Sequence, residues 1–230
     1  ARLQVILFVV GAVFAPAAAG AAIFSLYLAS FVIAFLTAWL LRRRFVSNEP
    51  LLLEMPPLRL PTWRFLGHES WRAMLQFLRG AGGFIIVGVL LVWFLTHYPF
   101  DAAPAGPATL AGHLAKVFSP VFAPLGIDEL LSIALLFGFV AKEVVVGALS
   151  VIYGVGGDDL STLLGARLDW VSAYSFLLFT LIYTPCLSTV AVLKQETKSW
   201  RLAAISVGLP LALAWVVSFA FYQGARALGF

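Results

Sequence analysis

Two apolar stretches of this chain contain residues that could carry an ion. The first runs Phe137-Gly-Phe-Val-Ala-Lys-Glu-Val-Val-Val-Gly147 and includes Lys142 and Glu143. A charge inside a membrane helix costs at least about 2.5–3.5 kcal/mol, so it is retained where it is paired or faces a cavity. Neighbours on a regular helix point about 100° apart, so Lys142 and Glu143 each need a partner of their own. Glu143 therefore either forms an ion pair that locks two helices or supplies charge to a polar path.

The second stretch places the only cysteine directly after a proline, in Tyr183-Thr-Pro-Cys-Leu-Ser-Thr189. Pro185 removes a backbone donor and frees carbonyl groups, which membrane depth tolerates only beside protein or water. Thiolate, hydroxyl and carbonyl groups are ligands that a borderline divalent cation such as Fe(II) accepts. The hydroxyl groups are those of Tyr183, Thr184, Ser188 and Thr189. Cys186 is either a ligand on a cation path or a small buried hydrophobic residue, and the residues alone leave both interpretations open.

The composition is that of an integral membrane protein. The chain has 230 residues, of which 62% are hydrophobic and 11% charged, and its mean hydropathy is +0.98. Soluble domains are about 25% charged, and the apolar runs approach the ~20 residues of a membrane-spanning helix. The predicted fold is all-α: a polytopic helical bundle with broken or re-entrant helices and an interfacial amphipathic helix. The net charge of +4 comes from basic residues that flank apolar spans, which indicates topology and not nucleic-acid binding.

The first half of the chain divides into two predicted regions. Residues 1–41 comprise an apolar run that we interpret as the end of a helix cut off upstream, a turn over 16–20 and a membrane helix over 21–41. Residues 42–80 have seven basic and three acidic residues, which favours the cytoplasmic side. Within them, prolines keep 55–61 extended. Over 62–79, apolar residues at near-helical spacing with basic residues between them predict an interfacial helix. That helix either guides the chain or contacts a soluble domain.

Residues 81–230 are expected to form the membrane bundle, with gate-like elements at 130–153 and 171–193. Further spans are predicted around 82–95 and 202–222, a short helix over 110–118, and polar loops over 154–169 and 194–201. If every run crosses fully, the charge bias of the last two loops points to the wrong sides. A re-entrant hairpin over 130–153, bent at 138–142, removes the conflict, so full crossing and re-entry both stay open.

Other candidate features carry less information. His97 and His113 could be metal ligands at an entrance, but they lie far apart and have no metal-binding spacing. Gly82, Gly83, Gly138 and Gly147 are interpreted as sites of close helix packing. No phosphate-binding loop and no catalytic arrangement of carboxylates or of Ser, His and Asp is found, so the chain is not expected to be an enzyme.

Several segments closely resemble the C-terminal membrane half of the bacterial ferrous iron transport protein B (Feo) family. They run in the expected order over nearly the whole chain: Glu54-Met-Pro-Pro-Leu-Arg-Leu-Pro61, Phe122-Ala-Pro-Leu-Gly126, Gly138–Gly147, Tyr183–Ala191 and Lys194-Gln-Glu-Thr-Lys-Ser-Trp200. The resemblance implies a multi-pass transporter of the bacterial inner membrane with Fe(II) as the transported ion and no tightly bound cofactor. It also implies a suspected metal pathway at Pro185 and Cys186, while Lys142 and Glu143 match a segment of unclear role.

The resemblance further implies an N-terminal GTPase domain and a first gate upstream of Ala1, with GTP and Mg²⁺ bound only there. Expected partners are membrane lipid, Fe(II), that N-terminal region, small accessory Feo proteins and further copies of the chain, with no nucleic acid. The alternatives are a gate module of a nucleoside-transporter-like carrier and a structural membrane scaffold. A nucleoside carrier is expected to bind the base and the ribose through amide groups, and neither interrupted stretch contains Asn or Gln.

Overall fold

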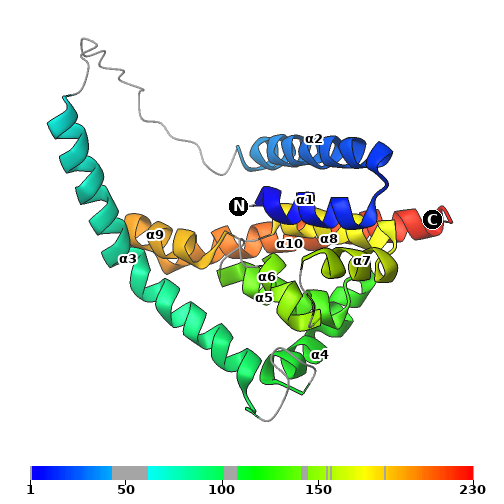
Figure 1. The fold of residues 1–230 in the computed structure, drawn as a ribbon. Coiled ribbons are helices and arrows are strands. Elements are labelled where there is room, and N and C mark those ends of the chain that lie inside the picture. The colour runs from blue at the N-terminus through cyan, green and yellow to red at the C-terminus, as the bar shows by residue number, and fades with distance from the viewer. Residues whose placement is uncertain are drawn as a thin grey trace.

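The structure is a computed structural model that describes residues 2–42, 62–100, 108–140, 145–153, 155, 157–183 and 185–229. All regular structure in these ranges is helical, as predicted (Figure 1). The elements are α1 (Arg2–Val13), α2 (Pro16–Leu41), α3 (Trp63–His97), α4 (Leu110–Phe122), the 3₁₀ turn η1 (Ala123–Leu125), α5 (Glu129–Val140), α6 (Val145–Tyr153), α7 (Gly157–Arg167), α8 (Trp170–Ile182), α9 (Leu187–Thr197) and α10 (Trp200–Ala227).

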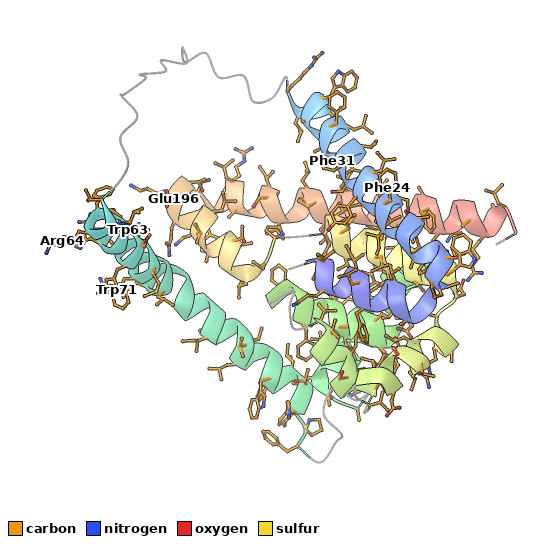
Figure 2. All side chains as sticks on the ribbon, turned by 45° about the horizontal axis from the view of Figure 1, so that its top comes forward. Phe24, Phe31, Trp63, Arg64, Trp71 and Glu196 are labelled. Atoms are coloured by element: carbon orange, nitrogen blue, oxygen red, sulfur yellow. The ribbon has the colours of Figure 1, made fainter. Side chains whose placement is uncertain are left out.

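Within the described residues, α2 and α10 are long and apolar enough to cross a membrane. Their 26 and 28 residues correspond to about 39 and 42 Å, more than the ~30 Å of a hydrocarbon core. Helix α4 with η1, followed by α5 after a bend of 103°, would make a third span. Phe24 and Phe31 of α2 are 70% and 73% exposed and project away from the bundle, as lipid-facing residues do (Figure 2).

Helix α8 lies in the centre of the bundle. Its sequence is apolar on nearly every side, and a helix of that kind needs neighbours all round. Residues 171–173 and 175–181 are buried, and the helix packs on α10, α1 and α2. The largest fully buried side chains of the protein include Phe176 and Phe179 of this helix. The core is therefore built around the helix that leads into the second interrupted stretch.

Side-chain contacts fix the directions of α2, α8 and α10. Near the start of α8, the Tyr174 hydroxyl lies 2.7 Å from Ser25 Oγ of α2, and its ring lies 4.7 Å from that of Phe221 in the last turns of α10. At the other end, Leu41 of α2 and Ile182 of α8 line one groove with residues 209–213 of α10. Helices α2 and α8 thus run in the same direction, and α10 runs against them.

These directions place the charged ends of the helices. Arg42, which follows α2, and the segment 198–201, where α10 begins, lie at one end of the bundle. The ion pair between Arg226 and Asp169, whose atoms are 2.7 Å apart, lies at the opposite end. The sequence-based conflict arose from assuming full crossings for every apolar run. With interrupted elements, the two basic segments lie at the same end, in agreement with their charge.

Three predicted boundaries change. Residues 62–79 and 82–95 belong to one continuous helix, α3, because 79–83 contain no proline and a glycine costs a helix only about 1 kcal/mol. Residues 16–20, expected to form a turn, begin α2, with Pro16 at a position where its missing N–H is not needed. The polar loop expected over 154–169 contains α7. Whether the first half of α3 lies in the membrane interface stays a prediction.

Candidate functional site at two helix breaks

The first interrupted stretch is divided into two short helices. Helix α5 ends at Val140 and α6 begins at Val145, and the two contact each other. Their 12 and 9 residues correspond to about 18 and 14 Å, so neither crosses a bilayer alone. Residues 130–153 thus contain two helices, but 138–140, where the predicted bend begins, belong to α5, and 141–144 lie outside the described residues, so the re-entrant bend stays a prediction. Lys142 and Glu143 lie outside the described residues, and their roles stay predictions.

The second interrupted stretch is also divided, at the proline. Helix α8 ends at Ile182, and Cys186 is the residue that precedes α9. The Cys186 carbonyl accepts a hydrogen bond from Val190 N at 3.1 Å, as the first bond of α9. Pro185 cannot donate a backbone hydrogen bond, which explains why the two helices do not join. Thr184 lies outside the described residues.

Cys186 and Thr189 form a small sulfur and oxygen pair on the first turn of α9. The Cys186 Sγ atom lies 3.1 Å from Thr189 Oγ1, and either group can be the donor. The thiol is partly exposed, and Thr189 is exposed. Ser188 belongs to the same turn. The structure therefore supports accessibility of the predicted Cys186 ligand and brings one of the predicted hydroxyl groups to it.

Tyr183 points toward the other interrupted stretch. Its side chain is buried, and its hydroxyl donates a hydrogen bond to the Leu135 carbonyl of α5 at 3.3 Å. Its ring stacks on Phe179 at 5.5 Å. The break after α8 is thus in direct contact with the helix that precedes the other break, a connection that neither stretch reveals by itself.

The glycine predictions have different outcomes. A Cβ atom on Gly138 would lie 2.8 Å from Val145 Cγ2 and closer still to the Tyr183 hydroxyl, so close packing is confirmed there. At Gly82, Gly83 and Gly147, nothing lies within 4 Å of the corresponding position. In the described structure, those three glycines do not serve close packing.

The described residues contain no group of three or more His, Cys, Asp and Glu side chains that could hold a metal ion. His97 stacks on Trp93 at 5.0 Å, and its Nδ1 lies 2.9 Å from the Trp93 carbonyl. The structure thus gives no support to a metal site formed by His97 and His113. A metal site that includes Cys186 would need further ligands such as Glu143. That Cys186 and Glu143 act together stays a prediction.

Sequence reasoning did not find the serine pair that holds α8 against α10. Ser175 Oγ donates to the Leu125 carbonyl at 2.7 Å, and Ser218 Oγ donates to the Ser175 carbonyl at 3.3 Å. Both serines are fully buried. Small polar residues in apolar helices are typical of helix contacts in membranes, and that was the available signal. The pair anchors the helix that leads to Tyr183.

Comparison with known proteins decides the family. The model of the Gate family, described as nucleoside recognition, matches residues 78–200, more than half of the chain. The chain belongs to the Gate family. The match includes both helix breaks of this Gate region and ends at Trp200, where α10 begins. A second model, the C terminus of ferrous iron transport protein B, matches residues 23–72.

Curated relatives confirm the resemblance to the ferrous iron transport protein B family. The Fe(2+) transporter FeoB of Synechocystis is 43% identical over 232 residues, and the match covers 100% of this chain and 38% of the relative. That of Methanocaldococcus jannaschii is 37% identical, covering 95% of this chain and 34% of the relative. This chain thus spans little more than a third of the length of these relatives. No solved structure matched it.

Proposed function

We propose that this chain forms part of the route by which a membrane transporter moves ferrous iron. The proposal rests on the 43% identity to an Fe(2+) transporter, in a match that covers the whole chain. The expected cargo agrees with the chemistry of that break, since a borderline divalent cation accepts sulfur and oxygen ligands. The family model that matches residues 23–72, that of the C terminus of ferrous iron transport protein B, also supports a role in transport.

In the proposed mechanism, Fe(II) loses part of its water shell beside Cys186. Thr189 Oγ1, 3.1 Å from the thiol, offers an oxygen on the same turn. The carbonyl groups at the end of α8 form the negative end of that helix dipole, which suits a cation. Thr184 and Ser188 would supply further oxygen ligands, and Glu143 a compensating negative charge. Weak ligands in series favour conduction, because an ion must also leave each site.

The charge distribution supports an orientation. Arg42 and the 198–201 segment share one end of the bundle, and we assign that end to the cytoplasm by the positive-inside rule. The protein is then a multi-pass protein of the bacterial inner membrane. By resemblance to the family, a GTPase domain and a first gate precede this region in the whole transporter, and GTP and Mg²⁺ bind there. Small accessory Feo proteins and other copies of the chain are further proposed partners.

A nucleoside carrier is the second candidate, because the matched family model is described as nucleoside recognition. A cavity of about 320 Å³ beside Tyr183 is the relevant space. Its walls are almost wholly apolar, with hydroxyl groups only from Ser132 and Tyr183. A base and ribose need several donors and acceptors to replace those of water. The lining therefore favours the iron proposal.

The deciding experiment is uptake of radioactive Fe(II) and of radioactive nucleosides by cells that express the full-length protein. Cys186→Ser and Glu143→Gln are compared with Ser206→Ala, a control whose hydroxyl donates to the Ala203 carbonyl within α10. We expect iron uptake that falls in the two test variants and persists in the control at equal membrane levels. Nucleoside uptake without iron uptake would overturn the proposal. Normal iron uptake in both variants would remove Cys186 and Glu143 from the path.

A further inference from the structure

We propose that Tyr183 is a positioning residue that ties the two helix breaks together and controls access to Cys186. Its hydroxyl joins the end of α8 to α5 at the Leu135 carbonyl and lies beside Gly138, where Val145 of α6 also packs. Its effect on the thiol follows from the structure alone, whereas any consequence for iron passage rests on the proposed function.

The first observation is the position of Tyr183 between the two breaks. It is the C-cap residue that follows α8, and its N–H donates to the Phe179 carbonyl at 2.8 Å. Its buried hydroxyl donates to the Leu135 carbonyl across the helix interface. Only two residues, 184 and 185, separate it from Cys186, which precedes α9. A movement of the Tyr183 side chain away from α5 therefore moves the end of α8 and the chain that leads to the thiol.

The second observation is the fit at Gly138. The Tyr183 hydroxyl and Val145 Cγ2 both occupy space that a Cβ atom on Gly138 would enter. Val145 is fully buried and is the first residue of α6. Gly138 thus lies where the end of α5, the start of α6 and the end of α8 converge. Only a residue without a side chain permits all three to approach this closely.

The third observation is the cavity of about 320 Å³ whose wall includes Tyr183, Phe179 and Leu135. Close-packed interiors resist small displacements, so a side chain can change position only where space exists. The cavity provides that space on one side of the Tyr183 ring. The ring can therefore occupy two places: against Gly138, as in this structure, or in the cavity with its hydroxyl released from Leu135.

Cys186 allows this idea to be measured without transport. It is the only cysteine in the 230 residues, and its alkylation by a maleimide can be followed on its own proteolytic peptide by mass spectrometry. The protein is kept in membranes. Removing the hydroxyl in Tyr183→Phe should raise the alkylation rate about twofold to tenfold, the equivalent of about 0.5–1.5 kcal/mol for one hydrogen bond. Gly138→Ala should raise the rate about tenfold or more, because the new methyl group displaces the ring.

The double variant gives the sharper test. The Tyr183 Cζ atom would lie 3.6 Å from a Cβ on residue 138, an ordinary contact distance, so the severe overlap with Tyr183 is with the hydroxyl alone. Tyr183→Phe should therefore partly rescue Gly138→Ala, giving an alkylation rate below the product of the two single effects. Loss of fold would instead make the defects accumulate. Gly147→Ala is the matched control, since nothing lies within 4 Å of its Cβ position.

The result that supports the proposal is faster alkylation in both single variants, partial rescue in the double variant and no change in Gly147→Ala. Wild-type rates in Tyr183→Phe and Gly138→Ala would overturn it, and so would strictly multiplicative effects. If Gly138→Ala does not accumulate in membranes, Tyr183→Phe decides alone. Altered alkylation with normal iron uptake would support the positioning role of Tyr183 and count against the proposed iron path. The two proposals can therefore fail separately.

Discussion

Gly126 is a residue outside the two breaks whose replacement should strongly destabilise the fold. It follows η1 with a φ of +73°, a left-handed conformation that favours glycine. It lies within the 103° bend between α4 with η1 and α5. A Cβ atom at Gly126 would also overlap the ring of Tyr222 in α10. Gly126→Ala therefore disturbs both the backbone and the packing at the bend.

The expected loss can be worked out from these two effects. A left-handed conformation costs a residue with a Cβ about 1–2 kcal/mol, and an extra methyl group in a packed site costs about 1–3 kcal/mol. Alanine makes the unfolded chain less flexible, which offsets about 0.4–1 kcal/mol. The free energy of unfolding should thus fall by about 1–4.5 kcal/mol. Membrane helices repack only partially around such a bend, so we expect the upper half of this range.

The assay is unfolding of the purified protein in detergent by temperature or by added SDS, followed by circular dichroism. Gly224→Ala is the matched control, since nothing lies within 4 Å of its Cβ position in α10. It should be unchanged or slightly more stable, because alanine favours helix over glycine. Gly126→Asn separates the two effects, as asparagine tolerates the left-handed region but keeps the overlap. Equal stability of Gly126→Ala and Gly224→Ala would refute the reasoning.

Three further predictions concern other parts of the bundle. Ser175→Ala should lower the free energy of unfolding by about 1 kcal/mol in the same assay, because the Leu125 carbonyl loses a buried partner; a neutral result would mean that another donor replaces the hydroxyl. Asp169→Asn should have a small effect at low salt that disappears in 1 M salt, since its ion pair with Arg226 is partly exposed; a salt-independent effect would contradict this. If the first half of α3 lies in the membrane interface, a variant with Trp63 as its only tryptophan should lose fluorescence in vesicles of brominated lipid, and an unchanged signal would place Trp63 in water.

The start of α3 is well placed for that last test. Trp63 is 89% exposed and Trp71 60% exposed, and both project from the first turns of α3 together with Arg64 (Figure 2). Helix α9 packs on α3, and Glu196 lies in its last turns. This arrangement leaves tryptophan and arginine side chains available at one end of the bundle, as an interfacial helix requires.

Sequence reasoning was most effective where a local rule decides the backbone. Pro185 cannot continue a helix, so the end of α8 and the start of α9 could be predicted to within a few residues. Apolar length similarly predicted the spans that became α2 and α10. The break within 130–153 followed from charge bias along the chain, because a full crossing would have placed basic and acidic loops on the wrong sides.

Long-range contacts were beyond that reasoning. No local rule says that the Tyr183 hydroxyl reaches a carbonyl 48 residues away, or that Ser175 meets Leu125 across 50 residues. The local sequence did not distinguish among the four glycines assigned to helix packing. Of these four, only Gly138 lies close to another helix. Which glycine packs depends on the direction of each helix, and that direction depends on bends such as the one at Gly126.

These contacts depend on one another through the fold. Gly126 permits the bend that directs α5 across the bundle, and the serine pair fixes α8 beside α10. Only when both helices hold these positions can Tyr183 meet Gly138 and Leu135. A defect at Gly126 should therefore reach Cys186 from a distance. Partial destabilisation in Gly126→Ala should raise alkylation of Cys186 under conditions where the bundle as a whole stays folded. The reason is that the bend positions α5, which is only one of the two helices joined by the Tyr183 contact.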